Sequence, residues 1–239
     1  MKERVDIEAI QLASRFAYGC QSVRLHEDKK LMSKMEVCIR EGEASDLEKK
    51  FKTIPDLNVY TKTLSQITGL PQFSYPVMEA YWFGNDLLKQ VQLKHYDLLL
   101  ENYAQQETKS AIIELLKIKR PKFFATHHVF SILHTDIELN DIGNLQNLQI
   151  ARDCTVRWGE VLEVENGRAK VTVVSLGENL GKLGLSQKEI TLEVNPVFTP
   201  DLETGNTVAI HLLRAVKILS REEKENLSFW TNKILGSID

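Results

Sequence analysis

The three cysteines of this 239-residue sequence are the side chains best suited to bind a metal ion or act as a nucleophile. Cys20, Cys38 and Cys154 are an odd number at wide spacing. This pattern offers neither a disulfide framework nor a CxxC zinc site, and it is typical of a reducing compartment. Cys38, in the run MEVCIR, is interpreted as a core residue, because free cysteine is among the most buried residue types. Cys20 is followed by His26, and a metal site built on these thiols must include histidines.

Three further histidines, His127, His128 and His134, stand close together in the run THHVFSILH. If this run is helical, His127 and His134 share one face; if it is a strand, His128 and His134 do. Combined with Cys20 or Cys154, they would form a nitrogen and sulfur site of the transition-metal type. The alternative is that the rings pack in the core with their nitrogens bonded to neighbouring groups.

The N-terminal half of the chain is predicted to be helical. From residue 5 to 118 the apolar residues recur at three- and four-residue spacing. Ser45 with Glu48 is interpreted as a capping box, Gly69 as a helix stop and Pro76 as a helix start.

The histidine-bearing segment that follows, residues 120–139, is rich in aromatic and β-branched residues, but its length favours a helix. The polar stretch 140–149 is then interpreted as a short connection between two halves. A short connection permits close docking, which would place the histidines beside Cys154.

A β-rich segment begins after this connection. Val161, Val171 and Val173 alternate with polar residues, and Asn166-Gly167 is a strong hairpin signal. The runs KEITLEV and TVAIHLLRAVKIL supply further strand-forming sequence.

The order of these elements predicts an α+β protein. An all-helical domain over residues 1–145 would precede a small, OB-like antiparallel β-barrel over 150–239, which ends in a helix that begins after Ser220.

The C-terminal third resembles the HypC/HupF family of hydrogenase-maturation chaperones. The matching pieces are Cys154 followed by TVRWGEVLEV, the turn ENG and RAKVTV; then GNTVAIH at 205–211; and then SREEKENL at 220–227. The resemblance covers residues 154 to about 235 and implies a HypC-like barrel in which Cys154 and His211 bind iron. In the other half, RFAYGC and EAYWFGN resemble an uncharacterised bacterial and archaeal family.

The resemblance implies an accessory protein in metallocentre assembly that holds an iron fragment, with carbon monoxide or cyanide among its ligands, for a metalloenzyme client or a maturation factor. A homodimer is compatible with this function. One alternative is a metal-dependent enzyme that binds zinc through His127, His128 and His134 with Cys20 or Cys154. The other alternative is a metal-free barrel module that binds protein or nucleic acid.

The composition argues against some of these functions. The formal net charge is −3, and charges of both signs are interspersed, which argues against a nucleic-acid partner. Because no apolar run approaches the roughly 18 residues of a membrane span and the N-terminus does not read as a signal peptide, we expect a cytoplasmic protein without membrane contact.

Overall fold

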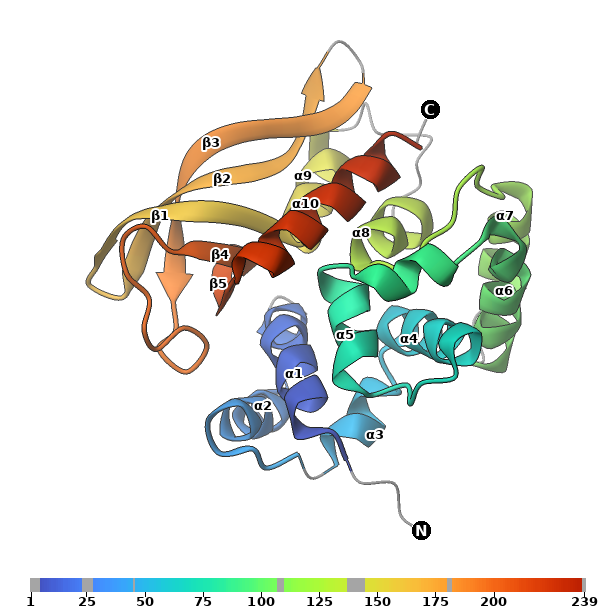
Figure 1. The fold of residues 1–239 in the computed structure, drawn as a ribbon, viewed down its shortest axis with the longest axis horizontal. Coiled ribbons are helices and arrows are strands. Elements are labelled where there is room, and N and C mark those ends of the chain that lie inside the picture. Colours follow the sequence, from blue (N-terminus) through green and yellow to red (C-terminus); the bar gives the residue numbers. More distant parts are fainter. Residues whose placement is uncertain are drawn as a thin grey trace.

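The computed structural model describes residues 5–22, 28–44, 46–106, 110–136, 145–179 and 182–237, and it confirms an α+β fold (Figure 1). Helices precede a five-stranded sheet, and a final helix follows it. In chain order the helices are α1 (Ile7–Ser22), α2 (Lys29–Glu41), α3 (Leu47–Phe51), α4 (Pro55–Thr68), α5 (Tyr75–Trp82), α6 (Tyr96–Gln105), α7 (Ser110–Ile118), α8 (His128–Ser131), α9 (Leu145–Cys154) and α10 (Arg221–Leu235), with 3-10 helices at Asp86–Gln90 and Leu93–His95 and a π-helical turn at Ile132–Asp136.

Local signals in the sequence mark several helix ends correctly. Gly69 ends α4 in the left-handed conformation, with φ 73°, and Pro76 lies in the first turn of α5. Ser45 lies outside the described residues, and the N-cap position of α3 is Asp46. The segment 120–139 is helical from His128 to Asp136, whereas the residues between Arg120 and His127 are not helical.

The polar stretch expected to be a connection contributes a helix instead. Helix α9 begins at Leu145 and ends at Cys154. It packs against strand β2. This contact stabilises the helix and could not be inferred from the polar sequence of the helix itself. Cys154 is therefore the last residue of a helix, and the first strand begins three residues later, at Arg157.

The strands are β1 (Arg157–Glu165), β2 (Arg168–Asn179), β3 (Lys182–Val194), β4 (Thr207–His211) and β5 (Arg214–Ile218). Their pairing order, β1-β2-β3-β5-β4, closes back on β1. The predicted wholly antiparallel barrel is wrong in one respect, because β3 pairs with β5 in parallel through Glu193–Arg214 and Val194–Ala215. The predicted hairpin is confirmed: Asn166 and Gly167 have φ 50° and 72°, as a tight turn between β1 and β2 requires.

The two halves share an apolar core. One cluster of buried residues joins Phe16 and Trp82 of the helical half with Trp158 and Ala209 of the sheet. A separate cluster, which includes Val161, Val171, Val208 and Ile210, fills the inside of the closed sheet.

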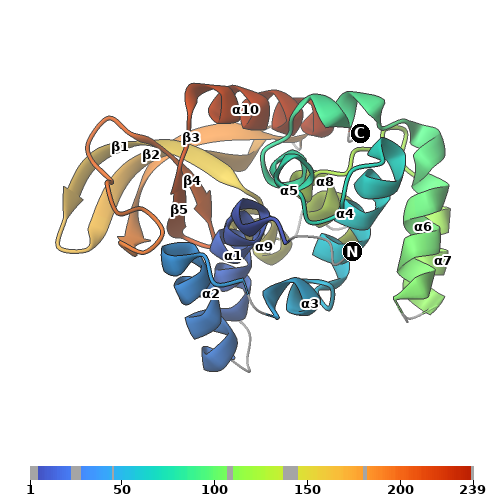
Figure 2. The same ribbon diagram turned by 60° about the horizontal axis from the view of Figure 1, so that its bottom comes forward.

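Two helices connect the halves. Helix α1 contacts α2, α5 and β5, and α10 contacts both β3 and α8. Figure 2 shows α10 running along the top of the molecule from β3 toward α5 and α8.

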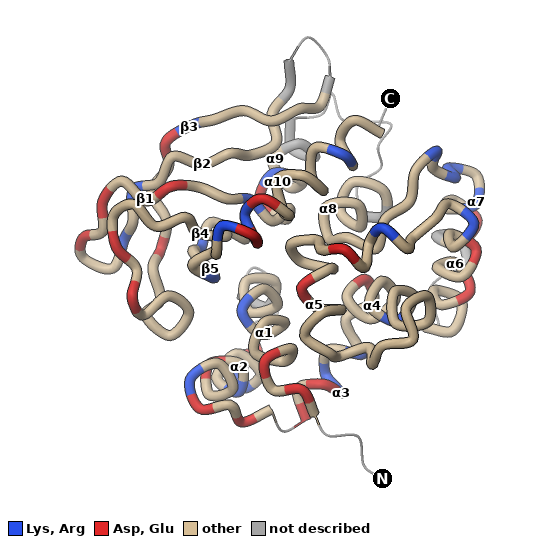
Figure 3. Tube along the Cα trace, in the orientation of Figure 1, with Lys and Arg blue, Asp and Glu red and all other residues tan. Residues whose placement is uncertain are grey.

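Figure 3 shows charged residues of both signs scattered over the helices and strands. Within the described ranges, no helix is both long and apolar enough to cross a membrane.

Candidate functional site

Four aromatic rings from distant parts of the chain meet where the helical half contacts the sheet. Phe16 of α1 stacks on Trp82 of α5 with ring centroids 4.4 Å apart. The centroid of His128 lies 4.5 Å from that of Trp82 and 5.4 Å from that of His211, the last residue of β4. We call Phe16, Trp82, His128 and His211 the junction cluster; all four are buried.

His128 uses both of its ring nitrogens. Its Nε2 lies 2.9 Å from the carbonyl oxygen of Cys154, and its Nδ1 lies 3.1 Å from the hydroxyl of Tyr81. Because a carbonyl oxygen only accepts, Nε2 carries the proton, and Nδ1 accepts from the Tyr81 hydroxyl. The histidine segment thus lies beside Cys154, as the short connection predicts, but the ring of His128 has no lone pair left for a metal ion.

His211 differs from His128 because only one of its two ring nitrogens has a hydrogen-bond partner among the described residues. Its Nδ1–H donates to the carbonyl oxygen of Phe16 at 3.0 Å, which leaves the lone pair on Nε2. That Nε2 has no hydrogen-bond partner among the described residues, although the side chain is fully buried. The next residue, Leu212, donates its backbone N–H to the carbonyl oxygen of Asp153 at 2.9 Å. The end of β4 is thereby tied to the end of α9, and Cys154 and His211 lie in one region.

The other two histidines point to different partners. His127 caps α8, where its Nδ1 accepts the backbone N–H of Val129 at 3.1 Å. The Nε2 of His134 lies 2.8 Å from the hydroxyl of Tyr96, which itself donates to the carbonyl oxygen of Leu116 at 3.1 Å. The histidine ring that contacts His128 is thus neither His127 nor His134 but His211, from the sheet.

The predicted cysteines have distinct surroundings. Cys38 is fully buried in the core, as predicted. Cys20 and Cys154 are half-buried, and Gly19, the residue before Cys20, packs against Leu212. His26 lies outside the described residues. Among the residues that the structure describes, no group of three or more His, Cys, Asp or Glu side chains has the geometry of a metal site.

Burial keeps the four inner histidines neutral at neutral pH. The pKa of His211 is lowered to about 4, mainly by burial and also by the nearby Arg157 guanidinium, while the backbone carbonyls of Phe16 and Cys154 oppose the shift. Burial also lowers the pKa of His127 to about 3 and that of His134 to about 4. The pKa of His128 lies well below its usual value, mainly because of burial. Neutral imidazole is the form that binds metal ions.

These depressed pKa values predict a loss of stability in acid. In the unfolded chain a histidine takes up a proton near pH 6.5, whereas His211 in the folded protein resists protonation down to about pH 4. Stability should therefore fall as the pH drops below 6.5, by about 2 kcal/mol at pH 5 for His211 alone. Urea unfolding at pH 7, 6 and 5 measures this slope. His211→Gln should flatten this slope more than His95→Gln, because His95 is only half-buried and burial lowers its pKa less; equal slopes in all three proteins would contradict the assignment.

Two residues important to this region are not predicted from the sequence. Nothing in the run EAYWFGN links Trp82 to His211. Arg157 is 2% exposed, and its guanidinium lies within electrostatic reach of Cys154 and His211. A signal for Arg157 exists in the alternation of β1, because Arg157, Gly159 and Val161 fall on the same face of the strand.

The possible metal ligands at this junction suit a metal ion that already carries other, non-protein ligands. They are the buried Nε2 lone pair of His211, a borderline ligand, and the thiol of Cys154, a soft one. A bare ion needs three or four protein ligands, which the described residues do not supply here.

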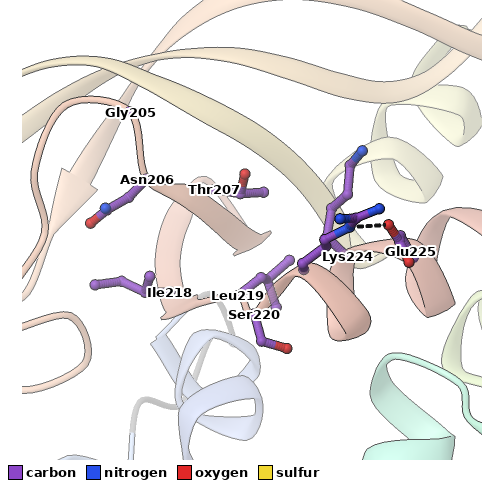
Figure 4. A pocket seen from close by; sticks show the side chains of 9 residues that line it. Gly205, Asn206, Thr207, Ile218, Leu219, Ser220, Lys224 and Glu225 are labelled. Atoms are coloured by element: carbon purple, nitrogen blue, oxygen red, sulfur yellow. Dashed lines mark hydrogen bonds and ion pairs between the residues drawn. The ribbon is translucent and has the colours of Figure 1, made fainter.

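A surface pocket between β4, β5 and the start of α10 holds none of the predicted site residues (Figure 4). Several of its polar groups already have partners within the protein. The hydroxyl of Ser220 accepts the backbone N–H of Glu223 at 3.1 Å, and Arg221 pairs with Glu225 at 2.7 Å. We therefore place the candidate site at the junction cluster.

Comparisons with curated proteins and with solved structures found no match. A family model, described as a family of unknown function (DUF6390), matches residues 28–239. This match covers most of the chain and agrees with the uncharacterised family indicated by the sequence. The chain therefore belongs to the family of unknown function DUF6390.

Proposed function

We propose that this protein is an accessory factor in metallocentre assembly that holds an iron fragment through the thiol of Cys154 and the Nε2 of His211. The observation that carries the proposal is the Nε2 of His211, a fully buried ring nitrogen with a lone pair and no partner among the described residues, in the same region as Cys154. The likeness to the HypC/HupF family supports the same two residues, and it rests on the sequence motifs alone.

The surrounding residues have definable tasks in this proposal. The carbonyl of Phe16 fixes the tautomer of His211, so that the lone pair stays on Nε2. His128 holds the end of α9 through the carbonyl of Cys154. The rings of Phe16 and Trp82 lie beside His211 and keep water away from its ring.

Bound iron would supply the site with a low-spin centre whose carbon monoxide or cyanide ligands are stabilised by electron density from the thiolate. The partner in this proposal is a metalloenzyme client or a maturation factor in the cytoplasm, and the protein itself acts as a carrier, alone or as a homodimer. The metal-dependent enzyme has weaker support, because the rings of His127 and His128 have their lone pairs engaged.

The test is iron analysis and infrared spectroscopy on protein purified without oxygen. We expect iron, with absorption bands in the carbonyl and cyanide region, in the wild type. Both signals should be lost in Cys154→Ala and in His211→Gln, since each change removes one of the two donors. Cys38→Ala is the matched control: it also removes one thiol, but from the core of the helical half, and it should keep the iron. Wild-type protein without iron, or iron that is unchanged in Cys154→Ala, would refute the proposal.

A further inference from the structure

Arg157 directs a charged side chain into one end of the closed sheet. It is paired across the sheet with Ile210 of β4, and Ile210 belongs to the apolar cluster that fills the inside of the barrel. Paired residues on neighbouring strands point to the same face. The guanidinium therefore lies on the inner side, next to the end of α9, with its side chain 2% exposed.

One edge of this guanidinium is unused. Nε and Nη2, which present two parallel N–H bonds on the same edge, have no hydrogen-bond partner among the described residues. The closest carboxylate oxygen is Oδ1 of Asp153, 3.6 Å from Nη2, which is too far for a hydrogen bond. A buried guanidinium edge without acceptors is costly, so native proteins supply an acceptor from a side chain, water or a ligand.

A second buried donor lies on the neighbouring strand. Ser175 follows Val174, the residue of β2 that pairs with Trp158, so Ser175 and Arg157 are opposite positions on the same face. The side chain of Ser175 is buried, and its hydroxyl has no hydrogen-bond partner within the described ranges. The two unused donors thus come from different strands.

The electrostatic surroundings favour an anion at this point. Arg152 and Arg157 both lower the pKa of Lys188, after the larger effect of burial, so three cationic groups act on one another here. The carboxylate that acts on Arg157 is that of Asp153, and the thiol of Cys154 has a smaller effect of the same sign. Three cations against this one carboxylate make a local positive excess in a chain with a net charge of −3.

We propose that Arg157 and Ser175 form a binding site for a small oxyanion, a carboxylate or phosphate group, at the α9 end of the barrel. Two oxygens of the anion accept from Nε and Nη2 of Arg157 in the bidentate manner for which guanidinium is suited, and one oxygen accepts from Ser175. The site uses neither Cys154 nor Nε2 of His211, so it goes beyond the proposed iron-binding function and does not depend on it.

The test is titration calorimetry of the metal-free full-length protein with inorganic phosphate and, separately, with acetate, at constant ionic strength set by chloride. We expect saturable binding of at least one anion; comparing the two identifies which group the site prefers. Ser175→Ala should weaken binding about fivefold through the loss of one hydrogen bond. Arg157→Lys keeps the charge but not the two parallel donors, and it should weaken binding about tenfold or more.

Two further variants separate a binding site from a purely structural ion pair. Asp153→Asn removes the negative charge nearest to Arg157 and should tighten anion binding, whereas a change that merely damages the fold would weaken it. Arg40→Lys, on the exposed face of α2, should have no effect. The proposal is overturned if neither anion binds to the wild type, or if Arg157→Lys binds as tightly as the wild type.

Discussion

Replacing Trp82 with alanine should lower the free energy of unfolding by about 3–5 kcal/mol, the range for deleting a large buried aromatic side chain. The indole is 2% exposed and is shared by the two halves of the molecule. It stacks on Phe16 and contacts the rings of Tyr81, His128 and His211. Its removal opens a cavity beside Tyr81, His128 and His211. The rings of these residues are held by hydrogen bonds and cannot collapse into the cavity without breaking them.

Chemical denaturation followed by circular dichroism measures this loss. Phe229→Ala is the matched control, since Phe229 is an aromatic residue of α10 that is 55% exposed, and its removal should cost less than about 1 kcal/mol. If Trp82→Ala costs no more than Phe229→Ala, the junction cluster does not hold the two halves together.

Gly84→Ala should cost about 3 kcal/mol or more, from strain and overlap together. Gly84 has φ 83°, a left-handed conformation that alanine adopts only with strain. A Cβ atom there would also lie 2.1 Å from Cδ1 of the buried Trp230, so α10 would have to move away from the end of α5.

Gly69 provides the comparison that separates strain from overlap. It has φ 73°, but no atom lies within 4 Å of a Cβ built there. Gly69→Ala should therefore cost about 1–2 kcal/mol, for backbone strain alone. Thermal unfolding of both variants gives the difference, which measures the close approach of Trp230. Equal losses would show that α10 moves freely at this point.

The features that the sequence predicts correctly depend on residues close together in the chain. Gly69 ends a helix, Pro76 starts one and Asn166-Gly167 forms a hairpin, each through its own backbone preferences. Ser220 forms a capping box with Glu223, three residues on. The order of helices, strands and final helix follows from such local signals, and with it the α+β class.

The features that escape prediction depend on residues brought together by folding. Helix α9 has a polar sequence and is stabilised by packing on β2, which no local pattern reveals. The parallel pairing of β3 with β5 joins strands separated by β4. At the site, Cys154 and His211 could be named from their motifs, but the engagement of His128 by Tyr81 and Cys154 could not, because it depends on three distant segments.

The hydrogen bond between Phe16 and His211 has a consequence for how the chain is made. These partners are 195 residues apart, so α1 leaves the ribosome long before the strand that completes its packing. At synthesis rates of about 5–20 residues per second, the apolar face of α1 waits roughly 10–40 s for β4. Such long-range closure slows folding and exposes intermediates to aggregation. We therefore expect this protein to need a chaperone during synthesis, after the helical half has left the ribosome and before β4 has been made.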